Sequence, residues 1–256
     1  MEIGAQLYTV REFAQTKEGI ENTLKKIASI GYKYIQASGI AAIDPHELRG
    51  IAEKSGLEIV VTHTNPDRVL NDTKSVINDH KILGCKHIGI GAMPPFYQGS
   101  SEGCRAFIRD FTPAAKLIAD AGMKFQYHNH HFEFEKDNGA VLFDILFDEM
   151  PGELMSFILD TYWIQVAGRC PHLEVERLKG RVDVCHFKDL SIVEGRQRMA
   201  AVMEGNLNFP AIIESCEKTG VEYAMVEQDD CYGQDPFEML AVSYRNLTAQ
   251  FSSRLR

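Results

Sequence analysis

The chain has 256 residues, 45% of them hydrophobic and 25% charged, and this composition excludes a disordered or low-complexity protein. Its net charge of −9 and pI of about 5.5, without a basic cluster, exclude a nucleic-acid-binding footprint, so no nucleic-acid partner is expected. No signal-peptide pattern and no run of about 18 apolar residues is present, and we therefore expect a cytoplasmic protein without a membrane partner.

Short apolar segments alternate with amphipathic, helix-length segments along the whole chain. The expected strands are Ile3–Tyr8, Tyr34–Ala37, Leu57–Thr62, His87–Gly91, Lys124–His130, Ser156–Asp160, Val182–Phe187 and Tyr223–Glu227. The expected helices are Lys17–Ile30, Asp44–Ser55, Asn71–Leu83, Thr112–Ala121, Val141–Glu149, Leu173–Leu178, Phe209–Thr219 and Pro236–Ser252. Their regular alternation predicts an α/β fold, a (β/α)₈ TIM barrel in which residues 1–256 form a single domain. An open doubly wound sheet is the alternative, but no Gly-rich phosphate loop follows the first strand.

Polar residues follow nearly every expected strand, at the end where such barrels carry their active sites. Asp160 follows the apolar run FIL, His186 follows VDVC and Glu227 follows AMV, while His128 and His130 end the fifth strand. Carboxylates and imidazoles that converge on one axis indicate a cation between them, because crowded carboxylates otherwise repel. Oxygen and nitrogen ligands without thiolate predict one divalent metal, Mn²⁺, Mg²⁺, Co²⁺ or Zn²⁺.

Each of these residues also has a purely structural interpretation. Asp160 could cap a helix, His186 could be a satisfied core histidine, and Glu227 could form an ion pair with Lys188. His128 alone would more often be structural than a ligand. The remaining histidines at element starts or on helices are expected at the surface; they are His46, His80, His87 and His172.

Six segments carry a resemblance to a known family. They are IGAQLYTVRE, GYKYIQASG, YHNHHFEF, LDTYW, CHFKD and VEQDD, at the first, second, fifth, sixth, seventh and eighth strands. With these segments the chain resembles the xylose-isomerase-like TIM-barrel superfamily of sugar-phosphate isomerases and epimerases. Relatives include tagatose 3-epimerase-like enzymes, inosose dehydratase and endonuclease IV.

The resemblance implies a metal site made of one residue from each of the last four strands. Three ligands carry over, onto Asp160, His186 and Glu227. At the fifth strand relatives have Glu-Asn-His where this chain has His128-Asn129-His130, so the ligand there is either His128 or the nearby Glu133. Two further departures are Trp163, where epimerases often have histidine, and Gln36, where many relatives have glutamate.

The function implied is a divalent-metal-dependent sugar or sugar-phosphate isomerase or epimerase, which moves a proton next to a carbonyl through an enediolate. Glu227, His130 and Glu133 are expected to share the proton transfer, and Lys188 to hold the substrate oxyanion. Tyr8, His63 and Trp163 are the expected substrate-binding residues. Because the fifth strand carries imidazole instead of glutamate, the two faces of the site differ.

Three other functions stay open on the same residues. A metal-dependent dehydratase or lyase acting on a keto-inositol or 3-keto-glycoside would use the same unequal faces. An endonuclease-IV-like enzyme would need more metal ligands and a basic surface. A non-enzymatic sugar-binding barrel would bind without turnover. For every function except the endonuclease-IV-like one, the expected partner is a small sugar or sugar phosphate. Relatives often form homo-oligomers.

Overall fold

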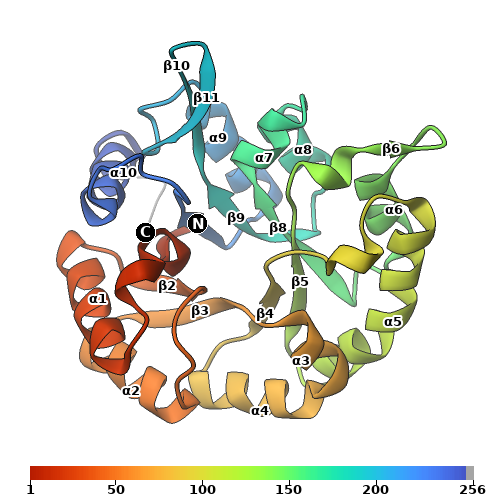
Figure 1. The fold of residues 1–256 in the computed structure, drawn as a ribbon, viewed down its shortest axis with the longest axis horizontal. Coiled ribbons are helices and arrows are strands. Elements are labelled where there is room, and N and C mark those ends of the chain that lie inside the picture. Colours follow the sequence, from red (N-terminus) through yellow and green to blue (C-terminus); the bar gives the residue numbers. More distant parts are fainter. Residues whose placement is uncertain (252–256) are drawn as a thin grey trace.

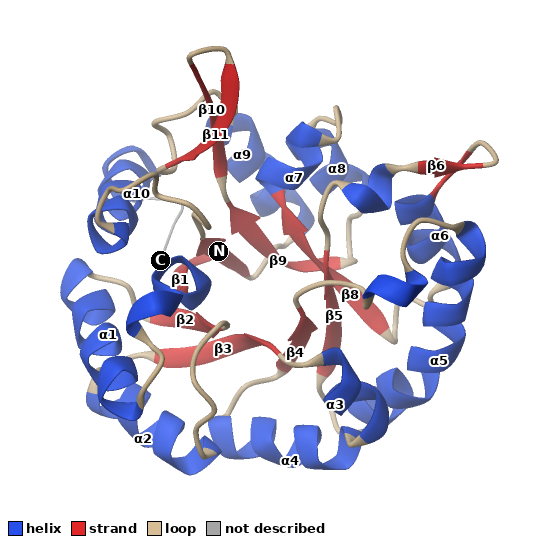
Figure 2. Cartoon of the chain, in the orientation of Figure 1, coloured by secondary structure: helices blue, strands red, loops and turns tan. Residues whose placement is uncertain are grey.

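The computed structural model describes residues 1–251, and these form a closed parallel β-barrel surrounded by helices (Figures 1 and 2). The barrel strands follow one another around the ring in the order β1-β12-β9-β8-β5-β4-β3-β2. They are β1 (Glu2–Gln6), β2 (Tyr34–Ala37), β3 (Glu58–His63), β4 (His87–Ile90), β5 (Lys124–His128), β8 (Met155–Asp160), β9 (Val182–Phe187) and β12 (Tyr223–Val226). The predicted (β/α)₈ barrel is confirmed.

Helices form the outer layer of the ring and cover the strands. They are α1 (Lys17–Ile30), α2 (Pro45–Lys54), α3 (Pro66–Asn71), α4 (Thr73–Leu83), α5 (Ser101–Asp120), α6 (Leu142–Glu149), α7 (Thr161–Val166), α8 (Pro171–Arg177), α9 (Phe209–Thr219) and α10 (Pro236–Phe251). Local sequence sets their ends: Asp44 caps α2 through the backbone N–H groups of His46 and Glu47, ahead of a proline at the first helical position. Gly220, at φ 84°, ends α9 in the left-handed conformation that glycine tolerates best.

Several segments differ from the expected elements. Helix α5 begins eleven residues before the expected Thr112 and continues through Pro113. The helices α3 and α7, the 3₁₀ turns and both hairpins were not expected. The hairpins are β6 (Lys136–Asp137) with β7 (Ala140–Val141) and β10 (Asp189–Val193) with β11 (Arg196–Ala200), and both project from the ring in Figure 1. The 3₁₀ turns are η1 (Leu7–Phe13), η2 (Pro95–Tyr97) and η3 (Phe132–Phe134).

The interior of the barrel is filled in layers. A middle layer of apolar side chains contains Val61, Ile158, Val184 and Met225. Glycines leave the space that these side chains need: a Cβ atom at Gly89 would lie 2.8 Å from the Ile158 Cδ1 atom and 2.5 Å from the carbonyl oxygen of Thr62. The main core lies between the strands and the helices. The interior of the barrel is therefore packed with side chains.

Two histidines expected at the surface are buried, and that expectation was wrong for them. His80 is 4% exposed and lies on the inner face of α4, where its Nε2 atom is 2.8 Å from the Thr62 hydroxyl. His87 is 5% exposed at the start of β4, where its Nδ1 atom accepts a hydrogen bond of 2.7 Å from the Gln126 amide. Their polar partners come from distant segments, so local pattern could not reveal them. No helix in residues 1–251 is long and apolar enough to cross a bilayer.

Candidate metal centre and active site

Four side chains converge at the carboxyl-terminal end of the barrel. One nitrogen or oxygen atom from each of His128, Asp160, His186 and Glu227 lies within 4.8 Å of the others, and all four residues are buried. They come from neighbouring strands, since β5, β8, β9 and β12 are consecutive around the ring; Figure 2 labels the first three of them. Asp160 and His186 stand directly opposite each other in the β8–β9 register. The four predicted metal-binding residues are thus brought together.

Strand alternation explains why these residues face inward. Successive side chains of a strand point to opposite faces, so positions two apart share a face. Ile158, Val184 and Met225 fill the middle layer, and the residues two positions further on are Asp160, His186 and Glu227. A polar layer therefore lies directly above the apolar one.

The two imidazoles are held so that one nitrogen of each faces the carboxylates. The His128 Nδ1 atom donates to the Gly91 carbonyl oxygen at 2.9 Å, which leaves Nε2 3.3 Å from Asp160 Oδ2. The His186 Nε2 atom donates to Gln36 Oε1 at 2.8 Å, which leaves Nδ1 2.9 Å from Glu227 Oε2. Outer hydrogen bonds of this kind orient metal-binding histidines. If each imidazole is neutral and keeps its proton on the outer nitrogen, the inward nitrogen directs a lone pair at a carboxylate. A cation between the two would stabilise this arrangement.

Negative charge exceeds positive charge in this region. The Lys188 ammonium lies 3.3 Å from Asp160 Oδ2, 3.2 Å from Glu227 Oε2 and 2.6 Å from Asp229 Oδ2, and it is 1% exposed. Against the opposing effect of burial, these carboxylates raise the pKa of Lys188, so the ammonium is charged. One ammonium stands against three carboxyl groups. The set of oxygen and nitrogen donors without thiolate suits a divalent cation of the kind expected, and the residues fit such an ion.

The titration of the carboxyl groups follows from their distances to Lys188 and to one another. Burial raises the pKa of Glu227, but Lys188 and His186 outweigh it and hold that pKa well below its ordinary value. The pKa of Asp160 is also lowered, because Lys188 and His128 outweigh burial. Burial and the Glu227 charge raise the pKa of Asp229 to about 6. Asp160 and Glu227 are therefore ionised near neutral pH and available as anionic donors.

The structural interpretations of two residues also hold. Asp160 caps α7, because its Oδ1 atom accepts the Trp163 backbone N–H at 3.0 Å. Its other oxygen, Oδ2, faces the cluster. Glu227 does form the ion pair with Lys188. These contacts fix the carboxylates in place and leave the cluster intact.

A cavity of about 360 Å³ opens above the cluster. Its lining includes Tyr8, His63 and His130 in addition to His128, Lys188, Glu227 and Asp229. Burial and neighbouring imidazoles lower the pKa of His63 well below its ordinary value, and they lower that of His130 to about 3. His63 Nε2 and His130 Nδ1 have no hydrogen-bond partner among residues 1–251. Both imidazoles are neutral and have a nitrogen free for a ligand.

Trp163 and Glu133 lie outside the lining of this cavity. The Trp163 ring is 5.4 Å from that of His130, and the Lys188 ammonium is 5.2 Å from its centroid. Glu133 does not reach the cluster: its Oε1 atom accepts the Tyr127 hydroxyl at 2.6 Å and its Oε2 atom accepts the His130 backbone N–H at 2.8 Å. Tyr127 packs between Phe107 and Phe157 in the layer outside the barrel. Of the two alternatives at the fifth strand, the structure brings His128 into the cluster.

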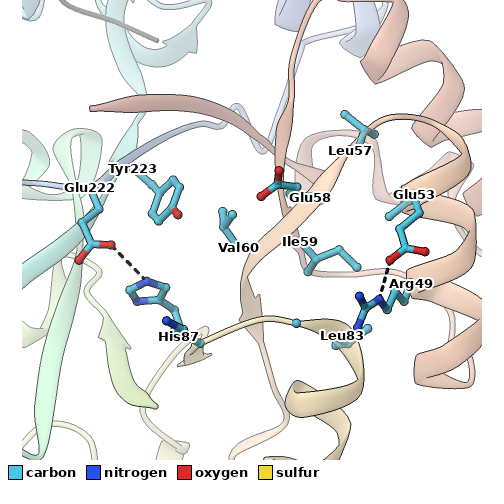
Figure 3. Close-up of a pocket in the computed structure, with 13 residues that line it drawn as sticks. Arg49, Glu53, Leu57, Glu58, Ile59, Val60, Leu83, His87, Glu222 and Tyr223 are labelled. Carbon is cyan, nitrogen blue, oxygen red and sulfur yellow. Dashed lines mark hydrogen bonds and ion pairs between the residues drawn. The ribbon is translucent and has the colours of Figure 1, made fainter. Parts of the chain in front are cut away.

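A second cavity, of about 560 Å³, lies at the opposite end of the barrel (Figure 3). It is lined by the starts of strands, including Glu58, His87 and Tyr223, and by Arg49 and Glu53 of α2. The His87–Glu222 and Arg49–Glu53 pairs, at 3.8 and 2.7 Å, flank it in Figure 3. None of the four clustered residues contributes to it. Amino-terminal ends of barrel strands contribute to stability rather than to catalysis, and we place the active site at the other end.

Comparison with known proteins agrees with this geometry. The family model described as xylose isomerase-like TIM barrel matches residues 24–239. The chain belongs to this family. The xylose isomerase-like barrel matches no curated protein significantly.

Solved structures similar to this xylose isomerase-like barrel cover nearly its whole length. A sugar phosphate isomerase/epimerase from Parabacteroides distasonis has 21% identity and a TM-score of 0.83, over 97% of this chain and 94% of that one. An L-ribulose 3-epimerase has 14% identity and a TM-score of 0.77, over 99% and 96%. The probable 3-DHS dehydratase of petrobactin synthesis from Bacillus anthracis has 15% identity and a TM-score of 0.73, over 98% and 100%. At these identities the likeness shows the fold alone.

Two residues of the site received no role from sequence reasoning. Gln36 is fully buried at the end of β2 and contacts His186, and Asp229 binds Lys188. Both stand at strand ends, which was the available signal. Their partners lie on other strands, so only the closed barrel reveals what they contact.

Proposed function

We propose that the protein is a divalent-metal-dependent sugar isomerase or epimerase that moves a proton next to a carbonyl group. The metal would be held by His128, Asp160, His186 and Glu227. The observation that carries this proposal is the convergence of these four donors, with both imidazoles turned inward by outer hydrogen bonds, beneath a cavity at the catalytic end of the barrel. Relatives of the same fold include enzymes described as sugar isomerases and epimerases.

The cavity suits a small polyol. Its volume of about 360 Å³ accommodates a monosaccharide, and its lining combines an aromatic side chain with polar groups. Tyr8 is partly exposed and would contact the apolar face of the sugar carbons. His63 and His130, both neutral, would exchange hydrogen bonds with hydroxyl groups through their unpaired nitrogens.

The charged groups of the cavity can carry the proton transfer. When bound, a divalent ion would polarise the carbonyl and hydroxyl oxygens of the sugar. Glu227 is ionised and lines the cavity, so it can accept the proton from the carbon next to the carbonyl. Lys188 is charged, buried and 3.2 Å from Glu227, so it can stabilise the negative charge that then develops on oxygen.

A dehydratase or lyase acting on a keto-sugar is the second candidate, and one observation favours it. Ionisable groups are distributed unequally around the cavity: Glu227 and Asp229 follow β12, whereas His63, His128 and His130 come from β3 and from β5 and the turn after it. Glu133, which would have restored a second carboxylate, is bonded elsewhere. An unlike acid and base suit isomerisation or β-elimination better than a symmetric epimerisation.

Proton NMR of candidate sugars in deuterated buffer tests both candidates. Purified protein would be stripped with a chelator, reloaded with Mn²⁺ for turnover and freed of paramagnetic metal before spectra are taken. Deuterium exchange next to the carbonyl with the carbon skeleton retained supports an isomerase or epimerase, and loss of water or of an aglycone supports the lyase.

Asp160→Asn is the matched variant for this experiment. It removes an anionic donor and leaves the Oδ1 atom that caps α7. We expect it to abolish turnover in a protein that remains folded. Turnover that persists undiminished in chelator-treated protein, or in Asp160→Asn, would contradict a metal-dependent reaction.

A further inference from the structure

The hydrogen bond between Gln36 and His186 crosses the interior of the barrel. Two strands, β1 and β12, separate β2 from β9 in the ring, and the two residues are 150 positions apart in the chain. Both side chains are completely buried. Strand pairing does not bring these two residues together, because β2 and β9 are not neighbours. The bond forms because both side chains extend toward the same point of the interior.

The backbone around Gln36 is irregular. In the β2–β3 pairing, Ile35 stands opposite Ile59 but Gln36 stands opposite Val61, so one residue of β3 is skipped at this point. Irregularities of this kind change the direction of the side chains beside them, and they are frequent next to active sites. The shift occurs at the residue that contacts a candidate metal ligand.

The contact supplies an acceptor for a proton on the Nε2 atom of His186. The partner of His186 Nε2 is the carbonyl oxygen of Gln36, an acceptor, at 2.8 Å. Nδ1 also faces an acceptor, Glu227 Oε2 at 2.9 Å, so a metal ion at Nδ1 would leave the single proton of a neutral imidazole on Nε2, where Gln36 accepts it. Gly91 has the same effect on His128, but through a backbone carbonyl that substitution cannot remove.

We propose that Gln36 is a positioning residue that orients the His186 ring for metal binding and accepts the proton of its Nε2 atom. This inference rests on the proposed function in one respect, the presence of a divalent ion at the cluster. Gln36 acts through His186 and has no contact with the metal. Its uncharged amide also orients the ring without adding a further carboxylate to a region that already holds Asp160, Glu227 and Asp229.

Mn²⁺ affinity of three variants, measured by titration calorimetry on chelator-stripped protein, tests the inference. Gln36→Leu removes the acceptor at similar volume and is expected to weaken Mn²⁺ binding about 10- to 100-fold. Gln36→Glu retains an acceptor and is expected to bind Mn²⁺ at least as tightly as the wild type. Gln6→Leu is the matched control, because Gln6 stands opposite Gln36 in the β1–β2 register, is equally buried and accepts its hydrogen bond from the Tyr8 backbone N–H.

Nitrogen-15 NMR of the histidine side chains in metal-free protein supplies a second readout. We expect the tautomer of His186 protonated on Nε2 to be less populated in Gln36→Leu than in the wild type, because its acceptor is lost while Glu227 remains beside Nδ1. Unchanged Mn²⁺ affinity in folded Gln36→Leu, or equal weakening by Gln6→Leu, would overturn the inference, as would equal tautomer populations of His186 in the wild type and in Gln36→Leu. If the wild type binds no divalent ion but the tautomer depends on Gln36 as expected, the proposed function fails and the positioning role survives.

Discussion

His128 occupies the position where sequence reasoning left two alternatives open. Its Nε2 atom is part of the cluster, whereas both oxygens of Glu133 are engaged by Tyr127 and His130. The tyrosine hydroxyl that binds Glu133 comes from β5 and the backbone N–H from the turn after it, and both belong to the scaffold. The geometry therefore favours a ligand role for His128 and a scaffold role for Glu133.

Substitution of these two residues should separate the roles. We expect His128→Ala to weaken Mn²⁺ binding by about 10-fold or more, because a direct donor is lost, and Glu133→Gln to change it little. Calorimetric titration of both variants measures the difference. A large loss of affinity in Glu133→Gln with retained affinity in His128→Ala would show that the assignment is reversed.

The buried carboxyl of Glu133 also predicts a pH dependence of stability. Burial raises the pKa of Glu133 from 4.5 to about 7, although hydrogen bonds from Tyr127 and His130 oppose the shift. A folded-state pKa above the unfolded one means that this contribution to stability is complete below about pH 4.5 and is lost as the pH rises through about 7. The shift corresponds to a loss of roughly 3 kcal/mol.

Urea unfolding at a series of pH values tests this dependence. Between about pH 5 and pH 8 the free energy of unfolding should fall more in the wild type than in Glu133→Gln, which cannot ionise. Parallel curves for the two proteins would show that the Glu133 carboxyl does not titrate in this range. The comparison uses the change of the free energy of unfolding with pH. A loss of stability that is the same at every pH in Glu133→Gln therefore does not affect it.

Part of the site was predictable residue by residue. Asp160, His186 and Glu227 each end an apolar strand, and strand alternation alone directs them inward. The choice between His128 and Glu133 was not predictable, because it depends on the turn that contains η3. Nor were the roles of Gln36 and Asp229, since Gln36 contacts His186 across the interior and Asp229 contacts Lys188 at the end of the neighbouring strand β9.

At the scale of elements, the β10–β11 hairpin and the segment after it depend on one carboxylate. Asp189, completely buried at the start of β10, accepts backbone hydrogen bonds from Leu190, Met203, Gly205 and Leu207. These bonds close a loop directly after Lys188. The hairpin escaped prediction because its turn is Glu194-Gly195, with φ of 52° and 74°, and not one of the common Asn-Gly or Asp-Gly turns.

Asp189→Ala should destabilise the protein by about 1–3 kcal/mol or more, because buried N–H groups lose their acceptor. Denaturant unfolding gives the loss of stability, and hydrogen exchange gives its location. We expect faster exchange at Met203, Gly205 and Leu207 than in the wild type. Unchanged exchange at these amides would mean that Asp189 does not hold the loop.

At the scale of the whole molecule, the closed barrel was predictable because eight apolar segments alternate with helical patterns and most helices end at a glycine or begin at a cap. The metal should bind this closed form alone. We expect chelator treatment to lower the melting temperature and Mn²⁺ to restore it, by about 2.7 kcal/mol of stabilisation at a concentration 100 times the Kd.

Differential scanning calorimetry with and without Mn²⁺ measures this effect. Asp160→Asn is the control, since a protein that has lost a ligand should not respond to the ion. The stripped wild type should stay folded, because Lys188 still neutralises part of the charge of Asp160, Glu227 and Asp229. An equal response of both proteins would place the ion elsewhere.

The bond between Gln36 and His186 has a consequence for the order of events during synthesis. Gln36 leaves the ribosome 150 residues before His186, and the ligands follow in the order His128, Asp160, His186 and Glu227. The last proposed ligand, Glu227, directly follows β12, which is the eighth strand of the barrel in chain order. A nascent chain therefore cannot offer all four proposed ligands to a metal until the last barrel strand has been made.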